Sequence, residues 1–408
     1  MRICARQSPT LGTAGVMATT LLACLASACD PPEDSPDGGA VVPSSSSQGS
    51  TSTGNATSGA GSGSSGNAAT GASGSLTTVS SSSEAGSSSV MAPYDIALTT
   101  GAEVQTASVT PQGGAPTRYY TGHAAAGRPA WSPTGDRLAY TSTNEYYTNP
   151  AVRILDVASG NSIAAGPGGS PDWSADGARI VSAYYGDVAV FDVSGGGAEV
   201  EPTGYYEAMN PLWAPGSNNR FAYVRKSSLT APLQLRVREL GGTEFTVAEH
   251  VTGYAWSPSG DAIAYSSPNA LPDQFGFYYG CDLNRATVSS LAVTDTTRMV
   301  RETNCAAHLA WAPDGSRLAW ADRYDYMYFV SLNAAFPVYN PDLTRFGPEW
   351  PNQVAGSLQW TPDGQMIAFA EQQDYYFAVS LLRPGQSGAP TEFRLDAPQL
   401  GFEFKPVP

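Results

Sequence analysis

The chain has 408 residues, of which 14% are charged and 10% are aromatic, and its net charge is -15. The excess of 36 acidic over 21 basic residues makes binding to nucleic acid or to anionic lipid headgroups electrostatically unfavourable. No segment has the periodicity of a long amphipathic helix, and the 21 Tyr residues suit an all-β protein.

Residues 1–29 have the features of an export signal. Arg2 and Arg6 flank the start, an apolar run extends from Leu11 to Leu25, and small residues lead to Cys29. The segment from Leu25 to Cys29 resembles a lipobox, in which the cysteine is acylated and becomes the mature N-terminus. We expect the lipid on Cys29; Cys24 is a second candidate, and a plain secretory signal is the remaining alternative. The apolar run is shorter than the roughly 20 residues that span a bilayer.

Residues 30–92 consist of Ser, Gly, Thr, Ala and Asn with almost no large apolar side chain. Such a segment cannot bury enough apolar surface to offset the entropy of ordering, so the composition predicts a disordered tether. About 60 flexible residues would reach roughly 40 to 45 Å and hold a folded domain clear of a membrane surface.

Six copies of one motif follow the tether. Each copy has a Trp, then a small residue and usually Pro, a turn Gly, and an apolar strand that usually contains Ala. The six tryptophans are Trp131, Trp173, Trp213, Trp256, Trp311 and Trp360, with a mean spacing of 45.8 residues. A repeat of this period predicts a propeller or a solenoid.

Each copy predicts a β-hairpin with an aromatic first strand and a glycine turn. In the third copy Gly216 comes one place early and the second strand one place late, which predicts a longer turn. A third apolar strand follows each hairpin, for example the segment that begins at Arg153, and short segments such as the one from Glu244 complete a four-stranded blade. We expect the tryptophans to be core wedges between blades.

The segments that begin at Trp256 (Trp-Ser-Pro-Ser-Gly-Asp-Ala-Ile-Ala-Tyr) and at Trp311 (Trp-Ala-Pro-Asp-Gly-Ser-Arg-Leu-Ala-Trp) resemble the repeats of TolB-type β-propellers. The resemblance covers about residues 94–408 and implies an all-β propeller of four-stranded antiparallel blades over residues 93–408. Similar repeats occur in the propellers of oligopeptidases, so the resemblance implies a fold rather than a function. We expect no counterpart of the α/β domain that precedes the TolB propeller, since the tether occupies its place.

The spacing favours seven blades, one of them split between the two ends of the chain. The segment from Asp95 matches the second strand of other copies, and the segment from Ala107 matches a third strand. Gly401 to Phe404 would then supply the missing first strand and remove the exposed sheet edges. The alternative is a ring of six blades with an additional N-terminal hairpin.

The sequence contains none of the common catalytic motifs. We therefore expect no catalytic residue, no metal and no cofactor. The sequence contains no Gly-x-Ser-x-Gly elbow, no phosphate-binding loop and no His-Glu-x-x-His. His123, His250 and His308 precede their tryptophans by eight, six and three residues, so repeat symmetry does not make them equivalent. The leading catalytic alternative is a propeller enzyme, such as a glycan lyase, with a His-based metal site.

The folded region contains two cysteines, Cys281 and Cys305. In a chain sent to an oxidising compartment these two residues predict a disulfide. Cys281 lies in the long excursion between the second and third strands of the fourth copy, and Cys305 lies in the link toward Trp311. We expect both segments at the same end of the ring.

Tyrosines recur just after the second strand of most copies, where the loops of a propeller ring one end of its axis. The candidate ligand-binding residues are Tyr146, Tyr147, Tyr185, Tyr278, Tyr279, Tyr324, Tyr326, Tyr375 and Tyr376. Tyr offers apolar area and a hydroxyl at low entropic cost, which suits glycan or protein contacts. The structural alternative is that one Tyr of each pair points into the blade, because neighbours in a strand face opposite ways.

Together these features predict a non-catalytic ligand- or protein-binding propeller, displayed on a lipid anchor in the bacterial cell envelope, on the periplasmic or the cell-surface side. The expected partner is an envelope protein, a peptide or a glycan. We expect contact with the membrane through the lipid alone and no nucleic-acid partner.

Overall fold

The computed structural model describes the chain between residues 94 and 407 with gaps. The described ranges are 94–101, 103–109, 117–143, 150–195, 199–201, 207–228, 230–270, 280–289, 292–303, 305–322, 327–332, 353–373, 376–384, 391–395 and 401–407. The predicted signal with Cys24 and Cys29, and the predicted tether, lie outside the described residues.

The described residues form β-strands and no helix, and they assemble into seven antiparallel sheets, numbered here in chain order. Sheet 1 contains β27 (Phe402–Phe404), β1 (Tyr94–Thr99), β2 (Val104–Val109) and β3 (Thr117–Tyr119). Sheet 2 contains β4 (Ala124–Trp131), β5 (Arg137–Thr143), β6 (Ala151–Asp156) and β7 (Ser162–Pro167). Sheet 3 contains β8 (Gly169–Trp173), β9 (Arg179–Tyr184), β10 (Asp187–Asp192) and β11 (Glu199–Glu201).

Sheets 4 to 7 continue the same pattern. Sheet 4 contains β12 (Glu207–Trp213), β13 (Arg220–Lys226), β14 (Gln234–Glu239) and β15 (Glu244–Glu249). Sheet 5 contains β16 (Gly253–Trp256), β17 (Ala262–Pro268), β18 (Cys281–Val288) and β19 (Val293–Thr303). Sheet 6 contains β20 (Ala306–Trp311), β21 (Arg317–Asp322) and β22 (Met327–Ser331), and sheet 7 contains β23 (Gln353–Trp360), β24 (Ile367–Gln373), β25 (Tyr376–Leu382) and β26 (Thr391–Leu395).

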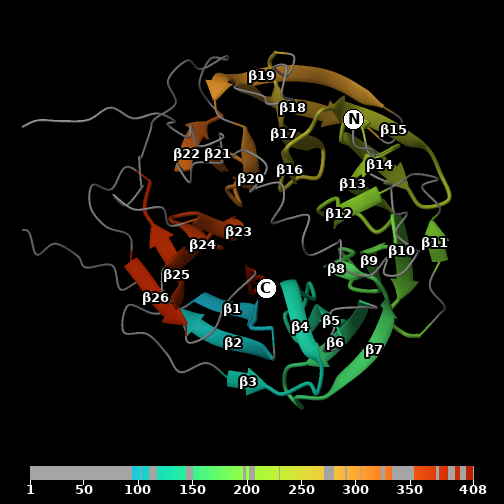
Figure 1. Ribbon diagram of the computed structural model, residues 1–408, viewed down its shortest axis with the longest axis vertical. Coiled ribbons are helices and arrows are strands. Elements are labelled where there is room, and N and C mark those ends of the chain that lie inside the picture. The colour runs from blue at the N-terminus through green and yellow to red at the C-terminus, as the bar shows by residue number, and fades with distance from the viewer. Residues whose placement is uncertain are drawn as a thin grey trace, which may run out of the picture. The chain divides into compact units, whose positions relative to one another are not determined.

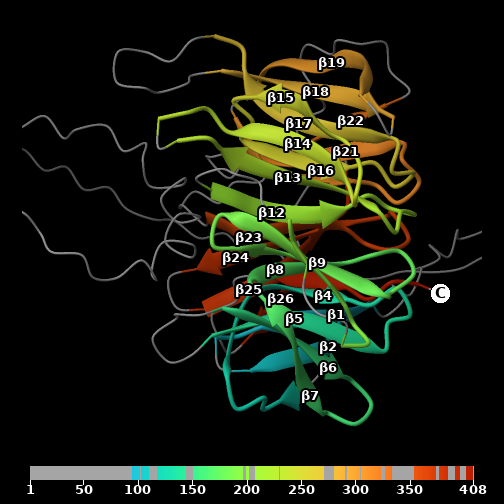
Figure 2. The same ribbon diagram turned by 90° about the vertical axis from the view of Figure 1, so that its right-hand side faces the viewer.

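The sheets stand around a central axis as a β-propeller, with the first strand of each sheet facing the centre (Figure 1). Figure 2 shows the sheets from the side, with neighbouring sheets packed face to face. A hydrophobic cluster fills each of the seven interfaces between neighbouring sheets. The described residues include no helix long and apolar enough to cross a membrane.

The strand β27 joins the two ends of the described chain. Its Phe404 pairs with Ile96 of β1, and its Phe402 pairs with Leu98. Sheet 1 packs on sheet 7 through residues such as Phe402 and Met366, and on sheet 2 through residues such as Ala97 and Leu138. Sheet 1 is therefore part of the ring, with Gly401 to Phe404 in the place that the split-blade prediction gives them.

The hairpin turn of each motif is built by local hydrogen bonds. In the first copy the Gly135 amide donates to the Ser132 carbonyl at 2.8 Å, and Gly135 has a φ of 67° that favours glycine. The Asp136 carboxylate accepts hydrogen bonds from the hydroxyls of Thr134 and Ser132, which hold its pKa below the usual value. In the Asp-Gly turns the carboxylates of Asp314 and Asp363 precede the glycine and accept hydrogen bonds within the turn, so they also serve the turn.

The third copy has the longer turn that its sequence predicts. The amide of Ser132 reaches the carbonyl of Arg137, five residues on, whereas the amide of Ala214 reaches the carbonyl of Arg220, six residues on. One additional residue is therefore accommodated in the turn, and Trp213 pairs with Phe221 on its far side.

The motif tryptophans are wedges between sheets. Five of them are 4 to 7% exposed, and Trp311 is partly buried. In five copies the indole Nε1 donates to a backbone carbonyl of the preceding sheet; the pairs are Trp131 with Glu403, Trp173 with Ala130, Trp256 with Leu212, Trp311 with Ala255 and Trp360 with Ala310. The partner is always the residue before the motif aromatic, so Phe404 of β27 takes the place of a tryptophan in sheet 1.

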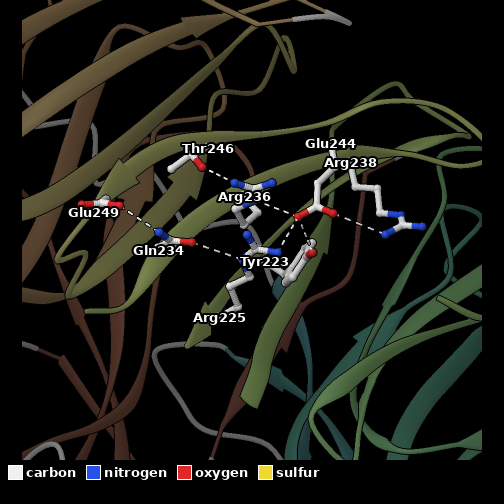
Figure 3. A network of polar contacts seen from close by, with 8 residues as sticks. All are labelled: Tyr223, Arg225, Gln234, Arg236, Arg238, Glu244, Thr246 and Glu249. Atoms are coloured by element: carbon white, nitrogen blue, oxygen red, sulfur yellow. Dashed lines mark hydrogen bonds and ion pairs between the residues drawn. The ribbon is translucent and has the colours of Figure 1, made fainter. Parts of the chain in front are cut away.

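A polar network around Glu244 joins the strands β13, β14 and β15 of sheet 4 (Figure 3). The Oε1 atom of Glu244 accepts from Tyr223 Oη at 2.9 Å, Arg225 Nη1 at 3.0 Å and Arg236 Nε at 2.7 Å. Oε2 lies 3.4 Å from Arg238 Nη1. One carboxylate on β15 thus holds guanidinium groups from β13 and β14, and the side chain of Arg225 is only 5% exposed.

Candidate functional site

The topology gives the ring two different ends. Because the strands of each sheet alternate in direction, one end carries the connections into each inner strand and the turns between second and third strands. We call this end the entry face. The opposite end carries the glycine turns of the motif and is called the motif face.

Two of the tyrosines that the sequence singles out are described, and both lie at the entry face. Tyr185 lies at the turn between β9 and β10, and Tyr376 is the first residue of β25. The other seven candidates lie outside the described residues; they are Tyr146, Tyr147, Tyr278, Tyr279, Tyr324, Tyr326 and Tyr375.

Tyr185 is exposed and held in an unfavourable backbone conformation. It forms the two-residue turn with Gly186, and both residues have positive φ, 45° and 91°. Such a turn is normally made by Asn-Gly or Asp-Gly, since a bulky L-residue is strained there. The Tyr185 side chain is nevertheless 63% exposed, with its ring edge-on to that of Tyr184 at a centroid distance of 4.7 Å. The turn chemistry alone does not account for a tyrosine at this place.

Other non-glycine residues with a strained, positive-φ backbone lie at the entry face or on the inner strands. The four described non-glycine residues with positive φ are Ser170, Tyr185, Asn210 and His250. His250 lies in the connection that enters sheet 5, and Ser170 and Asn210 lie at register shifts of the inner strands β8 and β12. Residues in such conformations persist where the surrounding structure requires them, often at binding sites.

The inner strands contribute one residue each to a ring around the axis, three places before each motif aromatic. We call these residues the inner ring; they are Arg128, Ser170, Asn210, Gly253, His308, Ser357 and Gly401. Ser170 and Asn210 are exposed, and the side chain of Arg128 is 34% exposed, so solvent reaches this part of the inner strands. Apart from His308, these residues carry no signal in the sequence, because the repeated motif begins at the tryptophan three places later.

Two carboxylates flank Arg128, one from each neighbouring sheet. Asp172 of sheet 3 lies 3.8 Å from it, measured from Oδ1 to Nη2, and Glu403 of sheet 1 lies within electrostatic reach. The other oxygen of each carboxylate is fixed by a backbone amide of the next sheet. Trp213 N donates to Asp172 Oδ2 and Trp131 N donates to Glu403 Oε2, both at 2.7 Å.

The surroundings shift the pKa of both carboxyl groups upward. Burial raises the pKa of Asp172 to about 6, although the Arg128 charge and the Trp213 amide act in the opposite direction. Burial, together with the charge of Asp172, raises the pKa of Glu403 to about 7 against the effect of Arg128. The side chain of Asp172 is 20% exposed, so it remains partly accessible to solvent.

Tyr254 belongs to the same group of interacting side chains. Its hydroxyl donates to the carbonyl of Ala222 at 3.0 Å and also to the carbonyl of Asn210. Burial and the charge of Asp172 raise the pKa of Tyr254 well above its usual value, so the phenol stays neutral.

The three histidines occupy unlike places. His123 and His250 are exposed in the connections that precede β4 and β16, whereas His308 lies within β20. Burial lowers the pKa of His308 to about 4, so its imidazole is neutral at physiological pH. Across the described ranges no group of three or more His, Cys, Asp or Glu side chains is arranged to hold a metal ion.

Cys281 and Cys305 form a disulfide, the pairing that the sequence predicts. Their Cα atoms are 4.9 Å apart, and Cys281 is fully buried. Cys281 begins β18 and Cys305 immediately precedes β20. The bond therefore ties sheet 5 to the connection into sheet 6, at the entry face.

No protein-family model matches the chain, and no curated protein matches it. Solved structures of similar fold include oligogalacturonate lyase in complex with manganese, with a TM-score of 0.53 and 15% identity over 71% of this chain and 90% of that one. Hydrazine synthase from Kuenenia stuttgartiensis gives a TM-score of 0.52 and 13% identity over 70% of this chain and 91% of that one. TolB from Acinetobacter baumannii gives 0.47 and 14% over 77% of this chain and 67% of that one. At these identities the first two likenesses support the propeller fold and assign no activity.

Proposed function

We propose that this chain is a non-catalytic binding protein of the bacterial cell envelope, which uses the entry face of its propeller to hold a protein, peptide or glycan partner. The observation that carries the proposal is Tyr185. A side chain that is 63% exposed occupies a turn position that asparagine or glycine would fill with less strain. Contact with a partner is a reason for keeping tyrosine there.

The chemistry of an exposed tyrosine suits this role. Its ring offers a large apolar surface, its hydroxyl donates and accepts hydrogen bonds, and few torsions are frozen on binding. Tyr184 packs edge-on against the Tyr185 ring and restricts it further. A restricted side chain loses less entropy when a partner binds.

The test is retention of a partner from detergent-solubilised envelope extract on the immobilised full-length protein. Tyr185→Gly removes the aromatic ring from a position whose backbone conformation favours glycine, so we expect retention to fall about tenfold or more without loss of folding. Ile163→Ser is the matched control, because Ile163 is 59% exposed on the outer strand β7, away from the entry face. Equal retention by wild type and Tyr185→Gly would show that the partner binds elsewhere.

The proposed location depends on acylation of Cys29, which is supported by the apolar run and the small residues before it. Cells given a fatty-acid analogue should label the wild-type protein and not Cys29→Ser. Cys24→Ser is the control and should label as wild type does. Label that persists in Cys29→Ser and disappears in Cys24→Ser would assign the lipid to Cys24.

A further inference from the structure

We propose that the inner ring is a second ligand site, separate from the Tyr185 surface, and that it takes a neutral oligosaccharide through Arg128, Asp172 and Glu403. The site goes beyond the proposed entry-face function, because it lies on the inner strands and uses none of the entry-face tyrosines. Three features of the described residues support it: unused hydrogen-bond donors, groups of both charge signs around them, and carboxylates in fixed positions.

The first feature is the guanidinium of Arg128. An arginine side chain carries five N–H donors. In the part of the chain that the structure describes, Arg128 makes one ion pair with Asp172 at 3.8 Å and no hydrogen bond. Its side chain is 34% exposed on the inner strand β4, so solvent reaches it. A bound molecule with oxygen acceptors would supply the hydrogen bonds that are missing.

The second feature is the charge around those donors. A cationic ligand would meet the Arg128 charge, and an anionic ligand would meet Asp172 and Glu403 on either side of it. A neutral polyhydroxylated ligand avoids both penalties. Each sugar hydroxyl can accept from Arg128 and donate to a carboxylate, which is the mixed pattern that this site offers.

The third feature is the fixed position of the carboxylates. Asp172 and Glu403 each use one oxygen to accept a backbone amide at 2.7 Å. The second oxygen of Asp172, Oδ1, lies 3.8 Å from Arg128 Nη2, and the backbone amide of Trp173 also interacts with this carboxylate. Oriented acceptors lose little entropy on binding, which favours a specific contact with hydroxyl groups.

Neighbouring residues extend the site and hold Arg128 in place. Asn210 and Ser170 are exposed on the adjacent inner strands and add an amide and a hydroxyl. On the other side, Gly401 packs so closely that a Cβ atom there would lie 2.8 Å from the Cα of Arg128. This close approach brings β27, and with it Glu403, against Arg128.

Calorimetry on the full-length protein in detergent, with five tetrasaccharides and the tetraamine spermine as probes, tests the proposal. The neutral probes are chitotetraose, maltotetraose and mannotetraose, and the charged probes are the glucosamine tetramer, the hyaluronan tetrasaccharide and spermine. We expect at least one neutral probe to bind at millimolar concentration or below, and all charged probes to bind more weakly. Absence of binding by all neutral probes, or preference for a charged one, overturns the proposal.

Three variants connect binding to the site. Arg128→Ala should lower the affinity for the neutral probe about 10- to 100-fold, as expected when hydrogen bonds to a charged group are lost. Arg298→Ala is the matched control on the outer strand β19, with a side chain that is 46% exposed and paired with Asp282, and it should leave binding unchanged. Unchanged binding in a folded Arg128→Ala protein contradicts the proposal.

The third variant tests the charge argument. Asp172→Asn combined with Glu403→Gln keeps an oxygen for each backbone amide and removes both negative charges, so Arg128 is no longer opposed. We expect this variant to gain binding of the hyaluronan tetrasaccharide. If Arg128→Ala and the double variant behave as wild type while Tyr185→Gly loses its partner, the inner site is wrong and the entry-face function stands.

Discussion

Tyr185 has a strained backbone conformation, and we propose that it is kept there for binding a partner. A non-glycine residue in the left-handed region costs about 1 to 2 kcal/mol, and Tyr185 has a φ of 45°. Since its ring is largely exposed, Tyr185→Gly should relieve the backbone strain at the cost of the contact with the Tyr184 ring. Part of this gain is offset, because glycine has more freedom in the unfolded chain.

We therefore expect Tyr185→Gly to be as stable as the wild type or up to about 1 kcal/mol more stable, measured by denaturant unfolding. Equal or higher stability together with lost retention is the pattern of a residue kept for binding. A clear loss of stability would mean that the tyrosine serves the fold.

Glu403 predicts a pH dependence of stability. Burial raises its folded-state pKa to about 7 from an ordinary value of 4.5. Between these values the folded protein keeps a proton that the unfolded chain has released, so stability falls as pH rises through this window. The free-energy difference between wild type and Glu403→Gln should therefore shift against the wild type between pH 4.5 and about 7. A difference that is constant across this range would contradict the assigned environment.

The sequence could predict the turn residues but not the inner ring, and the reason is physical. A turn is determined by neighbours along the chain, such as Ser132, Gly135 and Asp136, so its pattern repeats. Arg128 and Glu403 meet only because the ring closes, and the other copies have Ser, Asn, Gly or His at the position of Arg128. The sequence of one repeat does not reveal which residues of another repeat lie beside its inner strand.

At the scale of single elements, the strands of sheet 4 depend on Glu244. Its carboxylate holds Arg225, Arg236 and Arg238, and Arg225 is almost fully buried (Figure 3). Removal of one partner from a buried ion pair leaves a charge without compensation, which typically costs about 3 to 5 kcal/mol. Glu244→Gln should therefore destabilise the protein by roughly 3 kcal/mol in denaturant unfolding.

Glu249 on the same strand provides the control. It accepts a hydrogen bond from Gln234 at 2.8 Å, but it is exposed, so Glu249→Gln should cost less than about 1 kcal/mol. Similar costs for the two substitutions would show that the network contributes no more than a surface contact.

The strands themselves are well predicted where the pattern is local. The aromatic first strand, the glycine turn and the longer third turn at Gly216 all follow from residues within one copy. The length of β19, Val293–Thr303, has no such signal, because it depends on pairing with β18 through several register shifts. The disulfide between Cys281 and Cys305 could be predicted because the folded region offers one pair.

At the scale of the whole molecule, closure of the ring brings the inner strands together around one axis and forms the entry face. Phe402 and Phe404 of β27 complete sheet 1, and Gln359 of sheet 7 bonds to both of them, at 3.1 and 3.2 Å. The two ends of the described chain thereby meet in one sheet, and the seven interfaces are all filled. Residues far apart in sequence share one end of the ring for this reason.

The most direct test of the central claim compares the two ends of one sheet. A photo-crosslinking phenylalanine analogue is placed at Tyr185 on the entry face or at Ala175, which is exposed in the turn of the motif face of the same sheet. Both full-length proteins are then irradiated in native host cells. We predict a discrete adduct from position 185 and none from position 175. An adduct from position 175 alone, or no adduct from position 185, would contradict binding at the entry face.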